Sequence, residues 1–318
     1  MNIIYKKKII ILIIIIIITI LCCYYMNKEG FNSYYENKPK MNMVYLDEDN
    51  IEISTLGGYG KCLIIDGEIQ LCEKKEHIYH EMIVHFPAQY LKKNIENVVI
   101  IGGGDLMTLR EVMKYKTIKN VYMLELSPTI VDICKKYFDQ SDFKHDERVE
   151  IIYGDASKTI KDLITVEKEN IDMIIVDTTE DSENNLPVDK PAFFIDCFKL
   201  LNDNGILIKN GVFFKRMLED YDDLNTIPYN VDIPYFQEKY FFVIASKSDN
   251  DIKKNNINES RWKYYNIKTK FYKQKNHNNY IIFEDYDDDY ETENKLHKKI
   301  YGEDINIYND NDMYKKLL

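Results

Sequence analysis

Five short apolar runs, rich in isoleucine and valine, most strongly constrain the fold of this 318-residue chain. They lack the polar alternation of half-exposed strands, which is typical of strands buried on both faces of a parallel sheet. The runs are residues 98–102, 121–126, 149–153, 171–177 and 205–209. Segments with helical character separate them, at residues 106–115, 128–138, 156–166 and 190–201.

This order predicts an α/β fold, a Rossmann-like (methyltransferase-like) doubly wound sheet with right-handed crossovers. Residues 241–246 add a late strand, and residues 77–91 a helix before the first parallel strand. Three short strand candidates come earlier, at 51–54, 61–66 and 68–72, the last two joined at Asp66-Gly67, a hairpin signal. They predict a small N-terminal antiparallel β domain at 43–74.

The N-terminus carries a second strong signal. Residues 9–26 are almost entirely apolar and form about 27 Å of helix, just enough to span a bilayer. A cleaved signal peptide is the alternative, but no small-x-small cleavage site follows. We therefore expect an uncleaved single-pass anchor. Lys6, Lys7 and Lys8 favour a cytoplasmic N-terminus by the positive-inside rule, with the domain across the membrane, but Lys38 and Lys40 on the other flank also count, so the side of the domain stays open.

The chain ends in acidic sequence. Seven of the ten residues from Glu284 to Glu293 are acidic, and a solvated or disordered tail is expected there. The net charge of −11 argues against nucleic acid as a partner. The domain plan is a basic flank at 1–8, an anchor at 9–26, a linker at 27–42, the β domain at 43–74, the catalytic domain at 75–285 and the tail at 286–318.

Neither cysteine nor histidine spacing predicts a metal site or a disulfide framework. Cys62, Cys72, Cys134 and Cys197 form no CxxC pair and are interpreted as reduced core residues. His80 and His85 are five residues apart, which is wrong for two zinc ligands on one helical face. No metal is expected.

Carboxylates mark four successive strand ends. Ligands of open α/β sheets bind beyond these ends, where Asp105, Glu125, Asp155 and Asp177 stand. Helix capping explains any one of them, but explains four in a row poorly. Glycines 102–104 let the backbone turn tightly beside a ligand. Because no P-loop or complete pyrophosphate fingerprint occurs, the site favours a nucleoside without phosphates that carries a cation, such as S-adenosylmethionine or its decarboxylated form.

Several motifs together resemble the spermidine synthase family of aminopropyltransferases. They are Asp66-Gly67-x-x-Gln70, Tyr79-His80-Glu81-Met82, Gly102-Gly103-Gly104-Asp105, Leu109-Arg110-Glu111-Val112, Asp177-Thr178-Thr179-Glu180 and Trp262-Lys263-Tyr264-Tyr265-Asn266. The resemblance covers about residues 57–270.

The resemblance implies a donor site for decarboxylated S-adenosylmethionine, a co-substrate, with no prosthetic group. Glu125 would hold the ribose, Asp155 and Ala156 the adenine, and Asp105 the primary amine. The donor site would comprise Gln70, His80, Gly102, Gly104, Asp105, Glu125, Asp155 and Ala156.

The resemblance also implies an acceptor site for putrescine or another small polyamine. Asp177 would be the general base and Tyr79 would position the amine. The acceptor residues would be Tyr79, Asp177, Thr178, Thr179 and Glu180. Besides the acceptor, the expected partners are the membrane, through the anchor, and a second copy of the chain in a homodimer.

The sequence departs from the family at several places, and the nucleoside side is better kept than the acceptor side. No glycine occurs between Asp181 and Pro187, where the family has a loop over the thioether product. Residues 234–238 replace the family's Thr-Tyr-Pro-Ser-Gly near the acceptor pocket, and Leu106 replaces a glycine. Two alternatives therefore stay open, an amine methyltransferase that uses intact S-adenosylmethionine and a catalytically silent, membrane-tethered homologue.

Overall fold

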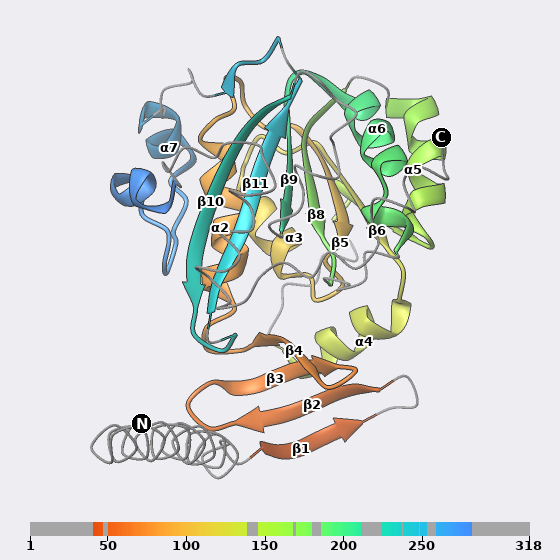
Figure 1. Cartoon of the computed structure of the whole chain (residues 1–318), viewed down its shortest axis with the longest axis vertical. Helices are drawn as coiled ribbons and strands as arrows, with labels where there is room; N and C mark the ends of the chain where they lie inside the picture. Colours follow the sequence, from red (N-terminus) through yellow and green to blue (C-terminus); the bar gives the residue numbers. More distant parts are fainter. Residues whose placement is uncertain are drawn as a thin grey trace, which may run out of the picture.

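A seven-stranded sheet forms the centre of the molecule (Figure 1). The computed structural model describes residues 41–46, 50–138, 146–167, 170–179, 186–210, 224–236, 238–247, 249–252 and 259–281. The sheet order is β10-β11-β9-β8-β5-β6-β7, with β9 to β7 parallel and the β10–β11 hairpin antiparallel. The strands are β5 Asn97–Gly102, β6 Asn120–Glu125, β7 Val149–Tyr153, β8 Ile171–Asp177, β9 Leu201–Asn210, β10 Asn225–Ile233 and β11 Glu238–Ser246.

Apolar side chains of the parallel strands point alternately into two cores. Val98 and Ile100 belong to the cluster under helices α2 and α3, whereas Val99 and Ile101 belong to the cluster under α5 and α6. All four are fully buried. The unbroken apolar runs are therefore explained by helices on both faces of the sheet, as predicted. The helices are α2 His77–Ala88, α3 Met107–Val112, α4 Pro128–Tyr137, α5 Ala156–Glu167, α6 Pro191–Leu200 and α7 Glu259–Tyr265.

A second, four-stranded antiparallel sheet lies beside α4 (Figure 1). Its strands are β1 Met41–Leu46, β2 Ile51–Leu56, β3 Gly60–Ile65 and β4 Glu68–Cys72. Ile53 and Leu63 pack against Ile133 and Phe138, which joins this sheet to the carboxyl-end side of the large one. The predicted fold class is confirmed, and the small sheet forms one wall of the space above the strand ends.

Several elements differ from the sequence prediction. Strand β1 and helix α7 were not predicted, and α2 ends at Ala88 instead of residue 91. Strand β10 was not predicted, because it mixes polar residues with Pro228; it lies at the sheet edge, where proline is tolerated. Helix α3 is shorter than the expected 106–115. Leu106 has a left-handed backbone (φ 67°), so the helix begins only at Met107.

Cys62 and Cys72 form a disulfide, and the expectation that both are reduced was wrong. The antiparallel register of β3 and β4 places them directly opposite each other, with Cα atoms 4.1 Å apart. The sequence spacing carries no signal for this pairing, since it depends on the register. Cys134 and Cys197 are buried and free, as predicted.

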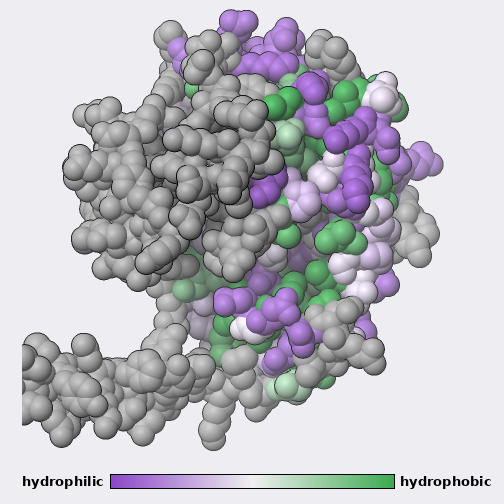
Figure 2. Space-filling view, turned by 45° about the vertical axis from the view of Figure 1, so that its right-hand side comes forward, coloured by the Kyte–Doolittle hydropathy of each residue, from purple (hydrophilic) through white to green (hydrophobic). Residues whose placement is uncertain are grey.

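The predicted anchor at 9–26 and the acidic tail at 286–318 lie outside the described residues. Within the part of the chain that is described, no helix is long and apolar enough to cross a membrane. Figure 2 shows hydrophilic and hydrophobic side chains interspersed over the described part of one face.

Candidate active site

The carboxyl ends of the parallel strands open into a cavity of about 410 Å³. The small sheet contributes Leu63, Ile65 and Gln70 to its wall. Of the predicted site residues, all that the structure describes line this one cavity: Gln70, Tyr79, His80, Gly102, Gly104, Asp105, Glu125, Asp155, Ala156, Asp177, Thr178 and Thr179. Glu180 lies outside the described residues.

A glycine turn brings the first parallel strand against the base of the cavity. Gly102 has φ +78°, and a Cβ added there would lie 2.2 Å from the carbonyl oxygen of Asp177. Only glycine fits such a position. The next residue, Gly103, donates its backbone N–H to the same oxygen over 2.9 Å. The turn thereby fixes the end of β8 and the carboxylate of Asp177 at the switch point of the sheet.

Asp177 has both carboxylate oxygens hydrogen-bonded. Tyr79 Oη donates to Oδ1 over 2.7 Å, and Thr108 Oγ1 donates to Oδ2 over 2.5 Å. Burial raises the pKa of Asp177, and the charge of Asp105 raises it further, while His80 and the two hydrogen bonds oppose the shift. A carboxylate with a raised pKa at the base of a cavity suits a general base.

The other three predicted carboxylates also cap local backbone. Asp105 Oδ1 accepts the N–H of Met107, Glu125 Oε1 that of Ser127, and Asp155 Oδ1 that of Ser157. Each of these three carboxylates therefore both accepts a local backbone N–H and lines the cavity. Burial raises the pKa of Glu125, whereas the hydrogen bond from the Ser157 side chain lowers the pKa of Asp155.

His80 connects the cavity to a buried ionic network. Its Nε2 lies 3.2 Å from Asp105 Oδ2, and its Nδ1 lies 2.9 Å from Glu76 Oε2. Arg110 pairs with both oxygens of Glu76 and, through Nε, with Glu111. No group of three metal-ligating side chains occurs among the described residues. The histidine is thus held by carboxylates.

Sequence reasoning missed several cavity residues. Asn210, at the end of β9, donates through Nδ2 to Tyr240 Oη (2.9 Å) and to the carbonyl of Thr178 (3.1 Å). Phe236 stacks on Tyr240, their ring centroids 5.2 Å apart, and both line the cavity. Polar strand-end residues would have pointed to Asn210. Phe236 lies within residues 234–238, which the family comparison singled out, but nothing local marks Tyr240, which reaches the cavity from the β10–β11 hairpin.

A short 3₁₀ helix, η1 Pro187–Asp189, forms another wall. Pro187 and Val188 line the cavity, and Asp189 Oδ1 lies 3.2 Å from Lys209 Nζ. Both partners of this ion pair are buried. The pair fixes η1 on β9 at the position where the sequence lacks the family's glycine.

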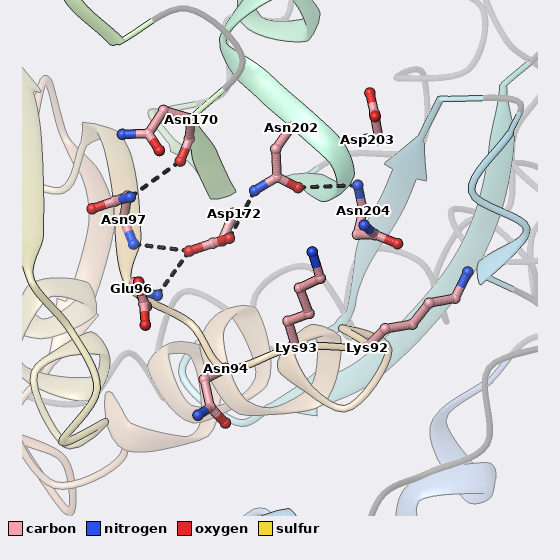
Figure 3. Close-up of a pocket in the computed structure, with 10 residues that line it drawn as sticks. All are labelled: Lys92, Lys93, Asn94, Glu96, Asn97, Asn170, Asp172, Asn202, Asp203 and Asn204. Atoms are coloured by element: carbon pink, nitrogen blue, oxygen red, sulfur yellow. Dashed lines mark hydrogen bonds between the residues drawn. The ribbon is translucent and has the colours of Figure 1, made fainter.

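A larger, polar hollow of about 670 Å³ lies at the opposite, amino ends of the strands (Figure 3). Asp172 at its centre accepts hydrogen bonds from the backbone of Glu96 and Asn97 and from the Asn202 side chain. These bonds join the starts of β5, β8 and β9. The hollow thus contains structural contacts, whereas the carboxylates predicted for chemistry gather at the carboxyl ends.

The fold and the cavity define an α/β enzyme with a nucleoside-type site at the switch point of its sheet. The family profile of the spermine/spermidine synthase domain matches residues 76–256. A polyamine aminopropyltransferase of Clostridium botulinum (strain Eklund 17B / Type B) is 34% identical over 236 residues, 70% of this chain and 80% of that one. One of Alkaliphilus metalliredigens is 35% identical over 233 residues, 69% and 79% of the two chains.

Solved structures agree in fold. A spermidine synthase in complex with the transition state analogue AdoDATO has a TM-score of 0.67 at 22% identity, covering 78% of this chain and 88% of that one. The enzyme from Thermotoga maritima gives 0.65. The chain belongs to the spermine/spermidine synthase family. The predicted family, enzyme class (a transferase) and reaction type, aminopropyl transfer, are confirmed.

Proposed function

We propose that the chain transfers the aminopropyl group of decarboxylated S-adenosylmethionine to putrescine or a related small amine. The observation that supports this most is Asp177, hydrogen-bonded to Tyr79 at the base of a cavity lined by three further carboxylates. The acceptor nitrogen attacks the carbon beside the sulfonium, a C–N bond forms, and the C–S electron pair returns to sulfur. Asp177 takes the proton of the amine, and neutral methylthioadenosine leaves.

In this proposal, the donor-site residues at successive strand ends bind different parts of the donor. Glu125 accepts the ribose hydroxyls, and Asp155 with Ala156 holds the adenine between β7 and α5. Asp105, beside His80 and Gln70, binds the primary amine. The acceptor lies toward Tyr79, Thr178, Thr179 and Glu180. Carboxylates suit both substrates, because each carries positive charge at neutral pH.

Calorimetry on the full-length chain in mild detergent tests the donor assignment. The decarboxylated donor should bind about tenfold more tightly than intact S-adenosylmethionine, about 1.4 kcal/mol, since Asp105 repels the added carboxylate. Asp105→Asn should narrow that preference, and the matched variant Glu125→Gln should weaken both ligands equally. Tighter binding of the intact form would favour methyl transfer instead.

For localisation, we propose that residues 9–26 anchor the chain in a membrane by a single pass. The apolar run and its length support an anchor. The three lysines before the run favour a catalytic domain on the side opposite the cytoplasm, and the Cys62–Cys72 disulfide is typical of an oxidising compartment.

Protease protection on sealed membranes, together with thiol counting, tests this orientation. The chain has six cysteines. Denaturing alkylation should label four of them if Cys62 and Cys72 are bonded in the cell, and all six after reduction. Six labels without reductant, with a domain open to cytoplasmic protease, would overturn the proposed orientation. The expected homodimer stays a prediction, which light scattering on the solubilised chain can test.

A further inference from the structure

We infer that Glu76 is a positioning residue for the reaction: it keeps His80 as an imidazolium, and this cation keeps the carboxylate of Asp177 ionised. The inference rests on the proposed function. Glu76 lies at the start of α2, outside the cavity, and acts only through His80.

The hydrogen-bond geometry around His80 fits a ring with two protons. Nδ1 lies 2.8 Å from the Glu76 carbonyl oxygen and 2.9 Å from Glu76 Oε2, and Nε2 lies 3.2 Å from Asp105 Oδ2. The carbonyl oxygen accepts, and so do the two carboxyl groups when they are carboxylates, in which case both nitrogens donate. The side chain is 2% exposed, so its hydrogen bonds are made mainly with these protein groups.

Arg110 keeps Glu76 ionised, so that its carboxylate can accept the hydrogen bond from His80. Its two terminal nitrogens lie 3.1 and 2.9 Å from the two oxygens of Glu76, a bidentate pair. Burial alone would raise the pKa of Glu76, but the hydrogen bonds and charges of His80 and Arg110 lower it to about 2. Glu76 is therefore an anion over the whole working pH range.

The charges around His80 come from several elements. Ionisable groups that interact with His80, Glu76, Asp105 or Asp177 include Tyr79, Arg110, Tyr235, Glu125, His77 and Cys134. Burial lowers the pKa of His80, but Asp105 and Glu76 outweigh that effect, and the pKa is raised well above its usual value. The cation in turn opposes the upward pKa shift of Asp177.

A second histidine on the same helix provides the contrast. His85 Nε2 lies 2.7 Å from Glu111 Oε2, but its Nδ1 faces Tyr115 Oη at 3.1 Å, and that hydroxyl can donate. One ring proton suffices, and burial lowers the pKa of His85. Glu111 is as buried as Glu76 and shares Arg110 with it, but makes no contact with His80. Glu111→Gln is thus a matched control for Glu76→Gln.

The test is the pH dependence of kcat/KM for the full-length chain, with decarboxylated donor and putrescine. In Glu76→Gln, His80 loses the anion that holds its second ring proton, so the pKa of Asp177 should rise. The acid limb should therefore move up by about one pH unit, with the alkaline plateau retained within a few-fold. Glu111→Gln should leave the limb in place. His80→Gln should shift the acid limb by a similar amount. Adding Glu76→Gln to His80→Gln should shift the acid limb no further, because both changes remove the same cation.

Equal effects of Glu76→Gln and Glu111→Gln at every pH would show a merely structural role and overturn the inference. If Glu76→Gln does not fold, ring ¹⁵N shifts of the wild-type chain, assigned with His80→Gln, decide: His80 should stay doubly protonated above pH 7.5, and titration near 6.5 would overturn the inference. Turnover by the wild-type chain in the same assay separates a failure of the proposed function from a failure of this inference. If the wild-type chain does not turn over, the proposed function fails. If it turns over normally and the acid limb of Glu76→Gln does not move, only the role of Glu76 is refuted.

Discussion

Thr108 donates a hydrogen bond to Asp177 over 2.5 Å, across 69 positions of sequence. The first turn of α3 is thereby joined to the end of β8, and the proposed base receives a hydroxyl donor opposite that of Tyr79. The hydroxyl lowers the pKa of Asp177 and so moderates the upward shift that burial causes.

Thr108→Val keeps the side-chain volume but removes this donor. A hydrogen bond to a charged acceptor contributes about 1.5–3 kcal/mol, so kcat/KM at pH 7 should fall by about tenfold or more. The acid limb should also move to higher pH, because the pKa of Asp177 rises further. Thr108→Ser retains the hydroxyl and should behave like wild type. Equal losses in the two variants would show that packing, not the hydrogen bond, matters.

Lys209→Met should loosen η1, the donor-side wall. The change leaves Asp189 buried without its cation, which costs several kcal/mol unless the segment moves outward. We expect donor affinity, measured by calorimetry, to fall about tenfold. Adding Asp189→Asn to Lys209→Met removes the unpaired buried charge and should restore most of the donor affinity. Unchanged affinity in Lys209→Met would mean that η1 does not depend on the ion pair.

Leu106 combines a left-handed backbone with a buried side chain, and two variants separate these effects. Leu106→Ala loses the packing and keeps the strain, so it should lower the free energy of unfolding by about 2–5 kcal/mol. Leu106→Gly also relieves the strain and should be more stable than Leu106→Ala by about 1 kcal/mol, although still below wild type. Urea titration measures both. A glycine variant less stable than alanine would contradict strain at this position.

His277 should make folding sensitive to acid. It stacks on Phe86 with ring centroids 4.1 Å apart, and burial lowers its pKa to about 4. The unfolded chain binds this proton near pH 6.5 but the folded chain only near pH 4. Stability due to His277 is therefore complete above pH 6.5 and is lost between 6.5 and 4, up to about 3 kcal/mol. In His277→Phe, urea midpoints should depend less on pH over this range; an unchanged slope would assign the acid sensitivity to other groups.

The sequence predicted what depends on local pattern. The five parallel strands were identified because helices cover both faces, as the alternation of Val98 and Val99 between two cores shows. The cavity carboxylates were identified because parallel strand ends meet at one edge. The partners of those carboxylates could not be found this way: Thr108 meets Asp177, and Glu76 meets Arg110, only after the chain has folded.

The errors have the same origin. The Cys62–Cys72 disulfide depends on strand register, which the spacing of cysteines does not encode. Strand β10 is an edge strand whose Pro228 argues locally against a strand. Leu106 adopts a backbone conformation that its residue type does not favour, so α3 begins one residue later than expected. In each case tertiary packing outweighs local preference.

The most direct test of aminopropyl transfer is product analysis with the full-length chain, decarboxylated S-adenosylmethionine and a panel of amines that includes putrescine. We expect the aminopropylated amine and methylthioadenosine in equal amounts, and a loss of about 10²-fold or more in kcat for Asp177→Asn, which cannot accept the proton. Methylated amine formed from intact S-adenosylmethionine, or undiminished turnover in Asp177→Asn, would contradict the proposed reaction and its base.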